Sequence, residues 1–255
     1  MTKILILDIE TSPNIAYVWR FFKENISPKQ VLEHTEILSF AAKWLGEDQV
    51  FYTDQQEGDE KFLLTILKGL LDDADIVVAH NGSRFDLPTI TGRFLINEIK
   101  PPSPYKIIDT VTVARNEFNF PSNSLEYLSG IFGVDKKDDH KKFPGFELWI
   151  ECLKNNPEAW EEMRLYNIQD VVTLEQIYLK MRPFIRNHPN VALINGDEKQ
   201  ACPKCGSNHI HWRGFAHTSV GKYHRYQCAD CGGWGRSRFT VVEPAIRKNL
   251  LVNAR

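Results

Sequence analysis

The pattern of apolar and polar positions begins with a short apolar run that ends in alternating acids. Residues Ile4 to Leu7 are apolar, and Asp8, Ile9 and Glu10 follow directly. The run predicts a buried strand. Because side chains alternate faces along a strand, Asp8 and Glu10 should point the same way. Two such carboxylates repel each other unless they bind a cation, and hard divalent ions prefer oxygen ligands. Ordinary surface acids at the end of a strand are the alternative.

The rest of the first 190 residues predicts strands first, and then helices that alternate with strands. Apolar stretches at 15–22, 35–44 and 49–53 predict three strands, with a turn at 46–48, so the sheet should open with antiparallel neighbours. Asp59 can cap a helix that follows it, and Asn156-Pro157 can begin a long helix that ends before Pro183. Between them we expect strands at 76–79 and 107–108 and helices over 87–99 and 124–132. This order predicts an α/β domain with helices packed on a mixed sheet.

Two later groups of polar residues could complete a site with the first strand. Residues 81–86, Asn-Gly-Ser-Arg-Phe-Asp, follow the strand at 76–79, and α/β sheets place sites at such strand ends. Asp86 could instead be a helix N-cap. Tyr166 and Asp170 are four apart and share a helix face. A carboxylate on a buried helix is costly unless it is paired or bound to metal, and a simple Tyr–Asp pair is the alternative.

The order of these three motifs resembles the DEDD exonuclease superfamily, which has a ribonuclease H-like fold. Acid-x-acid lies on an early strand, Asn-x-x-x-Phe-Asp follows a middle strand, and Tyr-x-x-x-Asp lies on a late helix. The tyrosine in the third motif indicates the DEDDy subgroup, because the subgroup with histidine would place it where this chain has Leu165. The resemblance spans roughly residues 4–180, and residues 124–128 and 166–179 look like phage and bacterial members.

The resemblance implies a two-metal-ion 3′–5′ exonuclease that releases nucleoside monophosphates. It implies that two Mg²⁺ or Mn²⁺ ions are held by Asp8, Glu10, Asp86 and Asp170, with Asp8 between the two ions. Tyr166 would orient the attacking water. The substrate contacts that it implies are Thr11, Asn81, Arg84 and Phe85, the last by stacking on a base. His80 is expected to pack or to support the site rather than to act as a general base.

Four of the five cysteines indicate a second, smaller module. Cys202 and Cys205 form one Cys-x-x-Cys pair, Cys228 and Cys231 form another, and 22 residues separate the pairs. Four thiolates in this layout are the ligands of a structural zinc ion, and the motif resembles a zinc ribbon. Two disulfides are the alternative. Cys152 stands alone and is expected to be a small buried hydrophobe.

Charge is distributed unevenly along the chain. Residues 1–195 hold 21 of the 31 Lys and Arg and 29 of the 33 Asp and Glu, a net charge of −8, whereas residues 196–255 have a net charge of +6. An acidic body suits cation binding, and a basic tail suits a polyanion. Basic and aromatic residues interleave between 211 and 239, as on surfaces that bind single-stranded nucleic acid. Some of these aromatics should instead form the small core of the ribbon. The charged segment 135–142 could be solvated or could touch a phosphate backbone.

With 255 residues, of which 42% are hydrophobic, we expect an exonuclease domain over 1–190 and a zinc ribbon over 197–255. The chain shows no secretion signal and no membrane-spanning run, so we expect a cytoplasmic protein with no membrane partner. Nucleic acid is the expected partner, with single-stranded DNA favoured and replication or repair proteins as further partners. An inactive nuclease fold that binds nucleic acid, an RNA exonuclease and an endonuclease are the alternatives.

Overall fold

The computed structural model describes residues 1–134 and 142–253, which divide into two compact units. Lys3–Tyr178 form one unit, called here the body, and Met1–Thr2 together with Leu179–Arg255 form the other. The charged segment that was expected to be solvated or to touch phosphate lies outside the described residues, apart from Lys142, which pairs with Glu158 at 2.5 Å.

A five-stranded mixed sheet organises the body. Its strand order is β5-β4-β1-β6-β7. The strands are β1 (Ile4–Thr11), β4 (Ile37–Trp44), β5 (Val50–Asp54), β6 (Ile76–Ala79) and β7 (Lys106–Asp109). Strand β4 runs antiparallel to β1 and β5, whereas β1, β6 and β7 are parallel. The predicted antiparallel opening of a mixed sheet is therefore confirmed.

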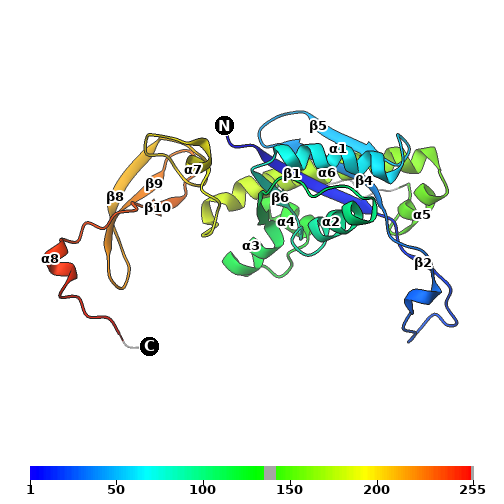
Figure 1. The fold of residues 1–255 in the computed structure, drawn as a ribbon, viewed down its shortest axis with the longest axis horizontal. Helices are drawn as coiled ribbons and strands as arrows, with labels where there is room; N and C mark the ends of the chain where they lie inside the picture. The colour runs from blue at the N-terminus through cyan, green and yellow to red at the C-terminus, as the bar shows by residue number, and fades with distance from the viewer. Residues whose placement is uncertain (135–141, 254–255) are drawn as a thin grey trace. The chain divides into compact units, whose positions relative to one another are not determined.

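Two helices cover one face of this sheet. They are α1 (Glu60–Asp73) and α2 (Asp86–Ile96), and the predicted cap is present, because Asp59 accepts from the Phe62 N–H at 2.8 Å. Figure 1 shows both helices against the sheet. The core here combines alternate residues of β1 with residues of β4 and of both helices, among them Leu5, Leu7, Ile9, Phe40, Leu63, Leu67, Ile90 and Phe94. Because Leu5, Leu7 and Ile9 face α1 and α2, Asp8 and Glu10 point to the opposite face.

The opposite face packs against α5 (Glu147–Leu153) and the long helix α6 (Pro157–Met181). Its core includes Leu38, Cys152, Trp160 and Met163, so the expectation that Cys152 is a buried hydrophobe is confirmed. The register of β1 against β4 shifts between Glu10 and Thr11 and leaves Leu38 as the extra residue. Such a bulge re-aims side chains.

Two buried polar contacts fasten α6 to β4. Ser39 Oγ donates to Asn167 Oδ1 at 3.2 Å, and the buried Lys43 ammonium pairs with Glu175, whose other oxygen accepts from the Gly46 N–H at 2.7 Å. Four strand residues span about 13 Å and eight helix residues about 12 Å, so both contacts fit one register. This register sets which α6 residues face β1.

The segment after β1 differs from the prediction. The expected strand over 15–22 is wrong, because only Ile15–Ala16 (β2) pairs, with β3 (Val31–Glu33), in a separate two-stranded sheet. A 3₁₀ turn, Pro28–Gln30, precedes β3. The aromatic residues that suggested a strand are exposed, and no sheet neighbour pairs with them. Helices α3 (Thr110–Glu117) and α5 were also not predicted, whereas α4 (Leu125–Phe132) ends at Gly133 as expected.

The other unit contains a three-stranded antiparallel sheet of order β10-β9-β8. Its elements are the 3₁₀ turn Arg182–Phe184, α7 (Val191–Asn195), β8 (Ile210–His217), β9 (Lys222–Cys228), β10 (Trp234–Arg236) and α8 (Pro244–Arg247). Val191 N–H donates to Pro203 O at 2.8 Å, which ties α7 to the first cysteine pair. Among residues 1–134 and 142–253, no helix is both long and apolar enough to cross a membrane.

Candidate active site and cysteine cluster

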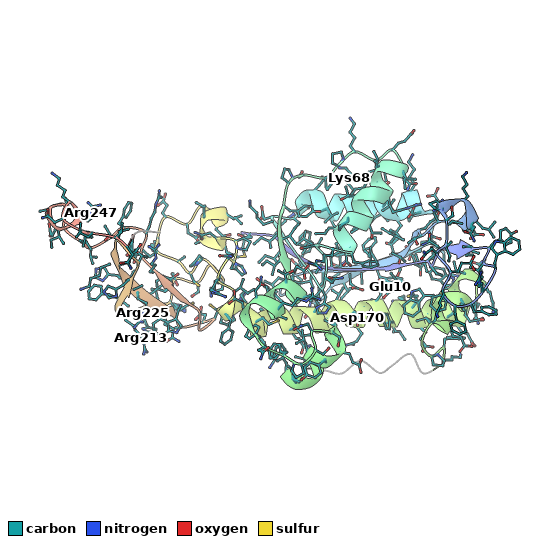
Figure 2. The ribbon with its side chains drawn as sticks, turned by 90° about the horizontal axis from the view of Figure 1, so that it is seen from below. Glu10, Lys68, Asp170, Arg213, Arg225 and Arg247 are labelled. Atoms are coloured by element: carbon teal, nitrogen blue, oxygen red, sulfur yellow. The ribbon has the colours of Figure 1, made fainter. Side chains whose placement is uncertain are left out.

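Three of the predicted acids meet between β1 and α6. One carboxylate oxygen from each of Asp8, Glu10 and Asp170 lies within 4.8 Å of the others, and Figure 2 labels Glu10 and Asp170 in the body. Asp170 is only 9% exposed. Carboxylates this close raise one another's free energy when ionised, and a divalent cation removes that repulsion.

Asn167 holds Asp8 in place. Its Nδ2 donates to Asp8 Oδ2 at 2.6 Å, and its Oδ1 accepts from Ser39 Oγ. Asn167 is fully buried, so both ends of the amide find partners where water does not reach. The contact leaves Asp8 with limited freedom to rotate, and it fixes the distance between β1 and the helix that carries Asp170.

Trp149 performs the same role for Glu10. Its indole Nε1 donates to Glu10 Oε2 at 3.2 Å, and its ring lies edge-on to Tyr166, with centroids 6.0 Å apart. Helix α5 therefore connects the strand acid to the tyrosine of the third motif. Tyr166 and Asp170 share a face of α6, as the spacing predicts.

Asp86 is not one of the three clustered carboxylates, but it lies beside the same strand. Its alternative role as an N-cap is wrong, because Phe85 occupies the cap position and Asp86 is the first residue of α2. Asp86 is 2% exposed, and within the described chain its Oδ2 has no hydrogen-bond partner. Burial raises its pKa to about 7, nearby Asp109 adds to the rise, and hydrogen bonds to its own backbone and to that of Ile9 oppose it. Ile9 separates Asp8 from Glu10, so this buried acid borders the cluster.

The loop before Asp86 is held by Asp109 at the end of β7. The Asp109 carboxylate accepts from the backbone N–H groups of Asn81 and Ser83, both at 3.1 Å. Asn81 has a φ of 67°, in the left-handed region, and a Cβ on Gly82 would lie 2.4 Å from the Ala79 Cβ. Glycine is therefore needed at 82, and the loop brings Asp86 to the backbone of Ile9 on β1.

His80 contacts the start of α3, and its expected role as a packing or supporting residue stays a prediction. Its Nδ1 lies 2.8 Å from Thr110 Oγ1, and burial lowers its pKa, so the ring stays neutral at physiological pH.

The predicted substrate contacts are all at least partly exposed to solvent. Arg84 and Phe85 are exposed, and Thr11 and Asn81 are partly buried near the ends of β1 and β6. Their roles stay predictions.

The carboxylates fit divalent metal ions. The donor set is all oxygen, which suits Mg²⁺ or Mn²⁺. Asp86 Oδ2 is buried without a partner in the described chain, a state that costs free energy unless something binds it. Asp8, Glu10 and Asp170 would hold one edge of the site, and Asp86 would approach from the side of Ile9.

The four cysteines form a separate cluster in the other unit. All four sulfurs lie within 4.8 Å of one another, with Sγ–Sγ separations of 3.7 Å for Cys202–Cys231 and 3.6 Å for Cys205–Cys228. A tetrahedral zinc–thiolate site has edges of about 3.8 Å, given zinc–sulfur bonds of about 2.3 Å. All four are free thiols, so the two-disulfide alternative is wrong. The cluster is zinc-ribbon-like, and the glycines after each pair have φ of 76° (Gly206) and 75° (Gly232).

Cations lie over aromatic rings on the sheet beside this cluster. Lys222 lies 3.9 Å from the Phe215 ring centre, Arg236 lies 3.8 Å from that of Tyr223, and Arg225 lies 4.9 Å from that of Trp234. By contrast, Tyr226 is buried and packs edge-on to Trp212. The interleaved residues thus divide into a small core and an exposed basic and aromatic surface.

Sequence reasoning missed the residues that orient the acids. Asn167 lies three residues before Asp170, so helix geometry places it on the same face, and this signal was available. Asp109 ends a strand, where sites gather. Trp149 and Ser39 had no such signal, because their roles depend on how α5 and β4 pack.

The mixed sheet, with α1 and α2 on one face and α5 and α6 on the other, is a ribonuclease H-like fold. The model of the RNase_H superfamily matches residues 32–182, and the chain belongs to that superfamily. A curated relative, the PolC-type DNA polymerase III of Ureaplasma parvum, is 30% identical over 149 residues, which cover 52% of this chain and 10% of that protein. The chain thus spans about a tenth of that relative's length. A solved structure, the family B DNA polymerase of Pyrobaculum calidifontis, matches 72% of this chain and 26% of its own at 16% identity and a TM-score of 0.50, a likeness of fold.

Proposed function

We propose that the chain is a metal-dependent 3′–5′ exonuclease that degrades nucleic acid, with single-stranded DNA as the favoured substrate. The observation that carries the proposal is the meeting of Asp8, Glu10 and Asp170 within 4.8 Å, with the buried Asp86 beside them. Membership of the RNase_H superfamily and likeness to two DNA polymerases support a nucleic-acid substrate.

The chain's own residues have separate tasks in this reaction. Asp8, Glu10, Asp86 and Asp170 would hold divalent cations, and such ions would make a water more acidic and would stabilise the charge on the phosphodiester. Asn167 and Trp149 keep Asp8 and Glu10 in fixed rotamers. The hydroxyl of Tyr166 hydrogen-bonds the attacking water and orients it toward phosphorus. Arg84 and Phe85 hold the terminal nucleotides through a phosphate and a base.

The zinc-ribbon-like cluster is proposed to bind one structural Zn²⁺, which keeps β8–β10 folded. Residues 196–255 have a net charge of +6, and their exposed cation–aromatic pairs suit a single strand. The tail would thereby raise substrate affinity without taking part in hydrolysis. Replication or repair proteins are further proposed partners of the protein.

The test is a cleavage assay on strands labelled at the 5′ end. Single-stranded DNA and RNA are incubated with Mg²⁺, Mn²⁺ or chelator, with Asp8→Asn as the matched inactive variant. Stepwise shortening that needs metal and Asp8 supports a 3′–5′ exonuclease, and the ratio of the two rates identifies the substrate. Internal cuts would indicate an endonuclease. Equal binding by both proteins without cleavage would favour a nucleic-acid-binding protein.

A further inference from the structure

An arm leaves the sheet directly after the strand that carries the acids. It comprises residues 12–36, between Thr11 at the end of β1 and Ile37 at the start of β4, which pair with each other. Figure 1 shows β2 and the loop beyond it extending away from the sheet at this end of β1. Glu10 is only two residues from Ser12 at the root of the arm, so the arm begins beside the carboxylates.

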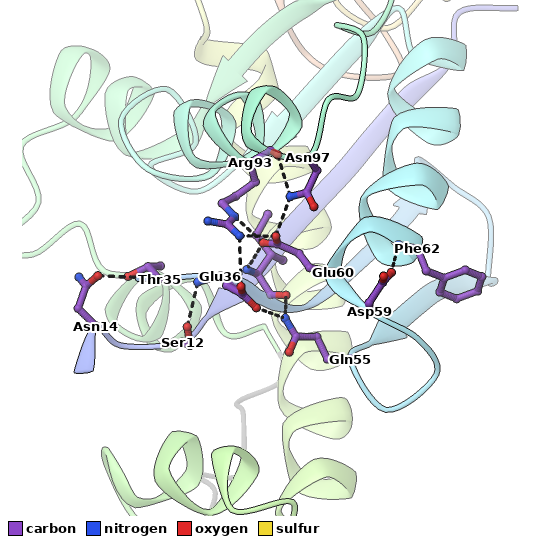
Figure 3. A network of polar contacts seen from close by, with 11 residues as sticks. Ser12, Asn14, Thr35, Glu36, Gln55, Asp59, Glu60, Phe62, Arg93 and Asn97 are labelled. Carbon is purple, nitrogen blue, oxygen red and sulfur yellow. Dashed lines mark hydrogen bonds and ion pairs between the residues drawn. The ribbon is translucent and has the colours of Figure 1, made fainter. Parts of the chain in front are cut away.

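The root of the arm is fixed by reciprocal hydrogen bonds. Ser12 N–H donates to Glu36 O, and Glu36 N–H donates to Ser12 Oγ, both at 2.9 Å. Thr35 N–H donates to Asn14 Oδ1 at 3.0 Å. Figure 3 shows these contacts next to a second set around Glu60. The arm therefore has a defined direction where it leaves the sheet.

Glu60 anchors the returning strand. It is 6% exposed, accepts from Ile37 N–H at 2.8 Å, and receives two bonds from Arg93, at 2.7 and 2.5 Å. Arg93 also reaches Glu36 at 3.4 Å (Figure 3). A buried charged group with this many partners resists displacement, so the end of the arm that returns to β4 is held firmly against α1 and α2.

The end of the arm has an ordered backbone and uncovered side chains. The Glu24 carboxylate accepts from the N–H groups of Trp19 and Arg20 at 2.9 and 2.8 Å, and Gln30 Nε2 donates to Tyr17 O at 3.0 Å. Yet Trp19, Phe21 and Phe22 are 92, 94 and 82% exposed. We call residues 17–22 the aromatic tip.

Three large rings left in water are costly, because each loses the free energy of burial, about 25 cal/mol per Å² of apolar surface. An ordered backbone that presents them together indicates a binding surface rather than a chance exposure. Cations lie among them, because residues 17–29 contain Arg20, Lys23 and Lys29 against one acid, Glu24, whose charge is engaged by backbone N–H groups. Residues 17–29 thus have a net charge of +2, whereas residues 1–195 as a whole have a net charge of −8.

We propose that the aromatic tip is a stacking platform for unpaired bases of the strand whose end is hydrolysed at the carboxylates. This inference rests on the proposed function. Rings that alternate with cations bind single strands, since each ring stacks on a base while the cations contact phosphates. Charge favours a polyanion over an apolar protein surface, and the position of the root favours the strand that enters this site.

The experiment measures binding by fluorescence anisotropy in chelator, and cleavage in Mg²⁺, on one set of proteins. The tip variant is Trp19→Ser/Phe21→Ser/Phe22→Ser. The matched control is Leu95→Ser/Ile96→Ser, which removes exposed apolar side chains at the end of α2. We expect at least a tenfold rise in Kd and KM for the tip variant, unchanged values for the control, and equal melting temperatures.

Two further readouts separate stacking from general attraction. Wild type should lose affinity for a strand with abasic positions, and the tip variant should lose clearly less, because only the rings of residues 196–255 remain to stack on bases. Trp19→Phe should retain affinity for the strand, because phenylalanine can also stack on a base. When the strand binds, however, the fluorescence of this variant should be quenched less than that of wild type, because Trp19 no longer contributes. Failure of either result would overturn the stacking proposal.

The proposal for the aromatic tip and the proposed exonuclease function can be disproved independently. If the tip variant cleaves with the wild-type KM, the platform is wrong and the exonuclease stands. If wild type binds strands through the tip but cleaves none with any metal, the exonuclease is wrong and the platform stands. If the tip variant changes only the sedimentation of the protein or its binding to lipid vesicles, the tip serves a second copy or a membrane, and the proposal is overturned.

Discussion

The Nδ2 of Asn167 donates to Oδ2 of Asp8 over 2.6 Å, which joins the first strand to the helix that carries Asp170. Asn167 is fully buried, and its other end is held by Ser39 on β4. Three elements thus meet at one amide. The separation of Asp8 from Asp170 depends on this contact as well as on the packing of α6.

Replacing Asn167 with leucine should weaken metal binding without unfolding the body. The variant keeps the branched shape and the number of side-chain heavy atoms but removes the donor to Asp8, and loss of such a supporting contact lowers metal affinity about 10- to 100-fold. A titration of cleavage rate against Mn²⁺ concentration should shift by this factor, and excess Mn²⁺ should restore the rate. Ser39→Ala is the control, since it leaves the bond to Asp8 in place and should shift the curve less. An unchanged midpoint for Asn167→Leu would show that Asp8 needs no support.

Removing the hydroxyl of Tyr166 should reduce turnover and leave binding intact. Tyr166→Phe retains the ring that packs against Trp149 but cannot hydrogen-bond the attacking water. We expect kcat to fall by about 10²-fold or more, with KM and the metal midpoint within a factor of about two. Steady-state kinetics on a single strand measures all three. If kcat is retained, another group orients the water.

The mixed sheet and the common face of Asp8 and Glu10 could be predicted from apolar runs and from the alternation along a strand, and the family resemblance grouped Asp170 with them. The sequence did not determine the supporting residues. Trp149 reaches Glu10 only because α5 packs over the strand end, and a short helix after a charged segment leaves little periodic signal. The prediction for residues 15–22 was wrong for a different reason. Aromatic residues favour a strand in sequence patterns, and the pattern does not show whether their rings are buried or exposed to solvent.

Asp86 should make the metal-free protein less stable as the pH rises. Its pKa is raised from 3.8 to about 7 by burial, so between these values the unfolded chain has released a proton that the folded chain keeps. Stability contributed by the protonated acid is lost as the pH rises toward 7. Asn at position 86 does not titrate, so Asp86→Asn avoids this loss. In chelator, the free energy of unfolding of the variant minus that of wild type should therefore increase by about 2–3 kcal/mol from pH 5 to pH 8. Urea unfolding at both values measures it.

Added Mn²⁺ is the control for that comparison. At pH 8 the metal stabilises the folded wild type by mass action and should remove or reverse the advantage of Asp86→Asn. A constant difference between the two proteins at all pH values, with or without Mn²⁺, would mean that Asp86 neither titrates with burial nor binds the ion.

Zinc removal should unfold the sheet β8–β10 and spare the chemistry. Cys205→Ser should lower the zinc content from one ion per chain to near zero, because structural sites need all four ligands. Hydrolysis of a small phosphodiester such as thymidine 5′-p-nitrophenyl phosphate should persist, while Kd for a long single strand rises. Cys152→Ser, which lies in the body, should keep the zinc. Loss of small-substrate hydrolysis in Cys205→Ser would make the cluster part of the active site.

One paired measurement tests most directly whether four carboxylates hold the catalytic metal ions. Mn²⁺ binding by calorimetry and cleavage of a 5′-labelled single strand are recorded on the same samples of wild type, Asp8→Asn, Glu10→Gln, Asp86→Asn and Asp170→Asn. We predict two Mn²⁺ per wild-type chain, weaker or fewer ions in each variant, and cleavage reduced by about 10³-fold or more in all four. Wild type that binds no Mn²⁺, or a variant that loses its ions and still cleaves at the wild-type rate, would contradict the account.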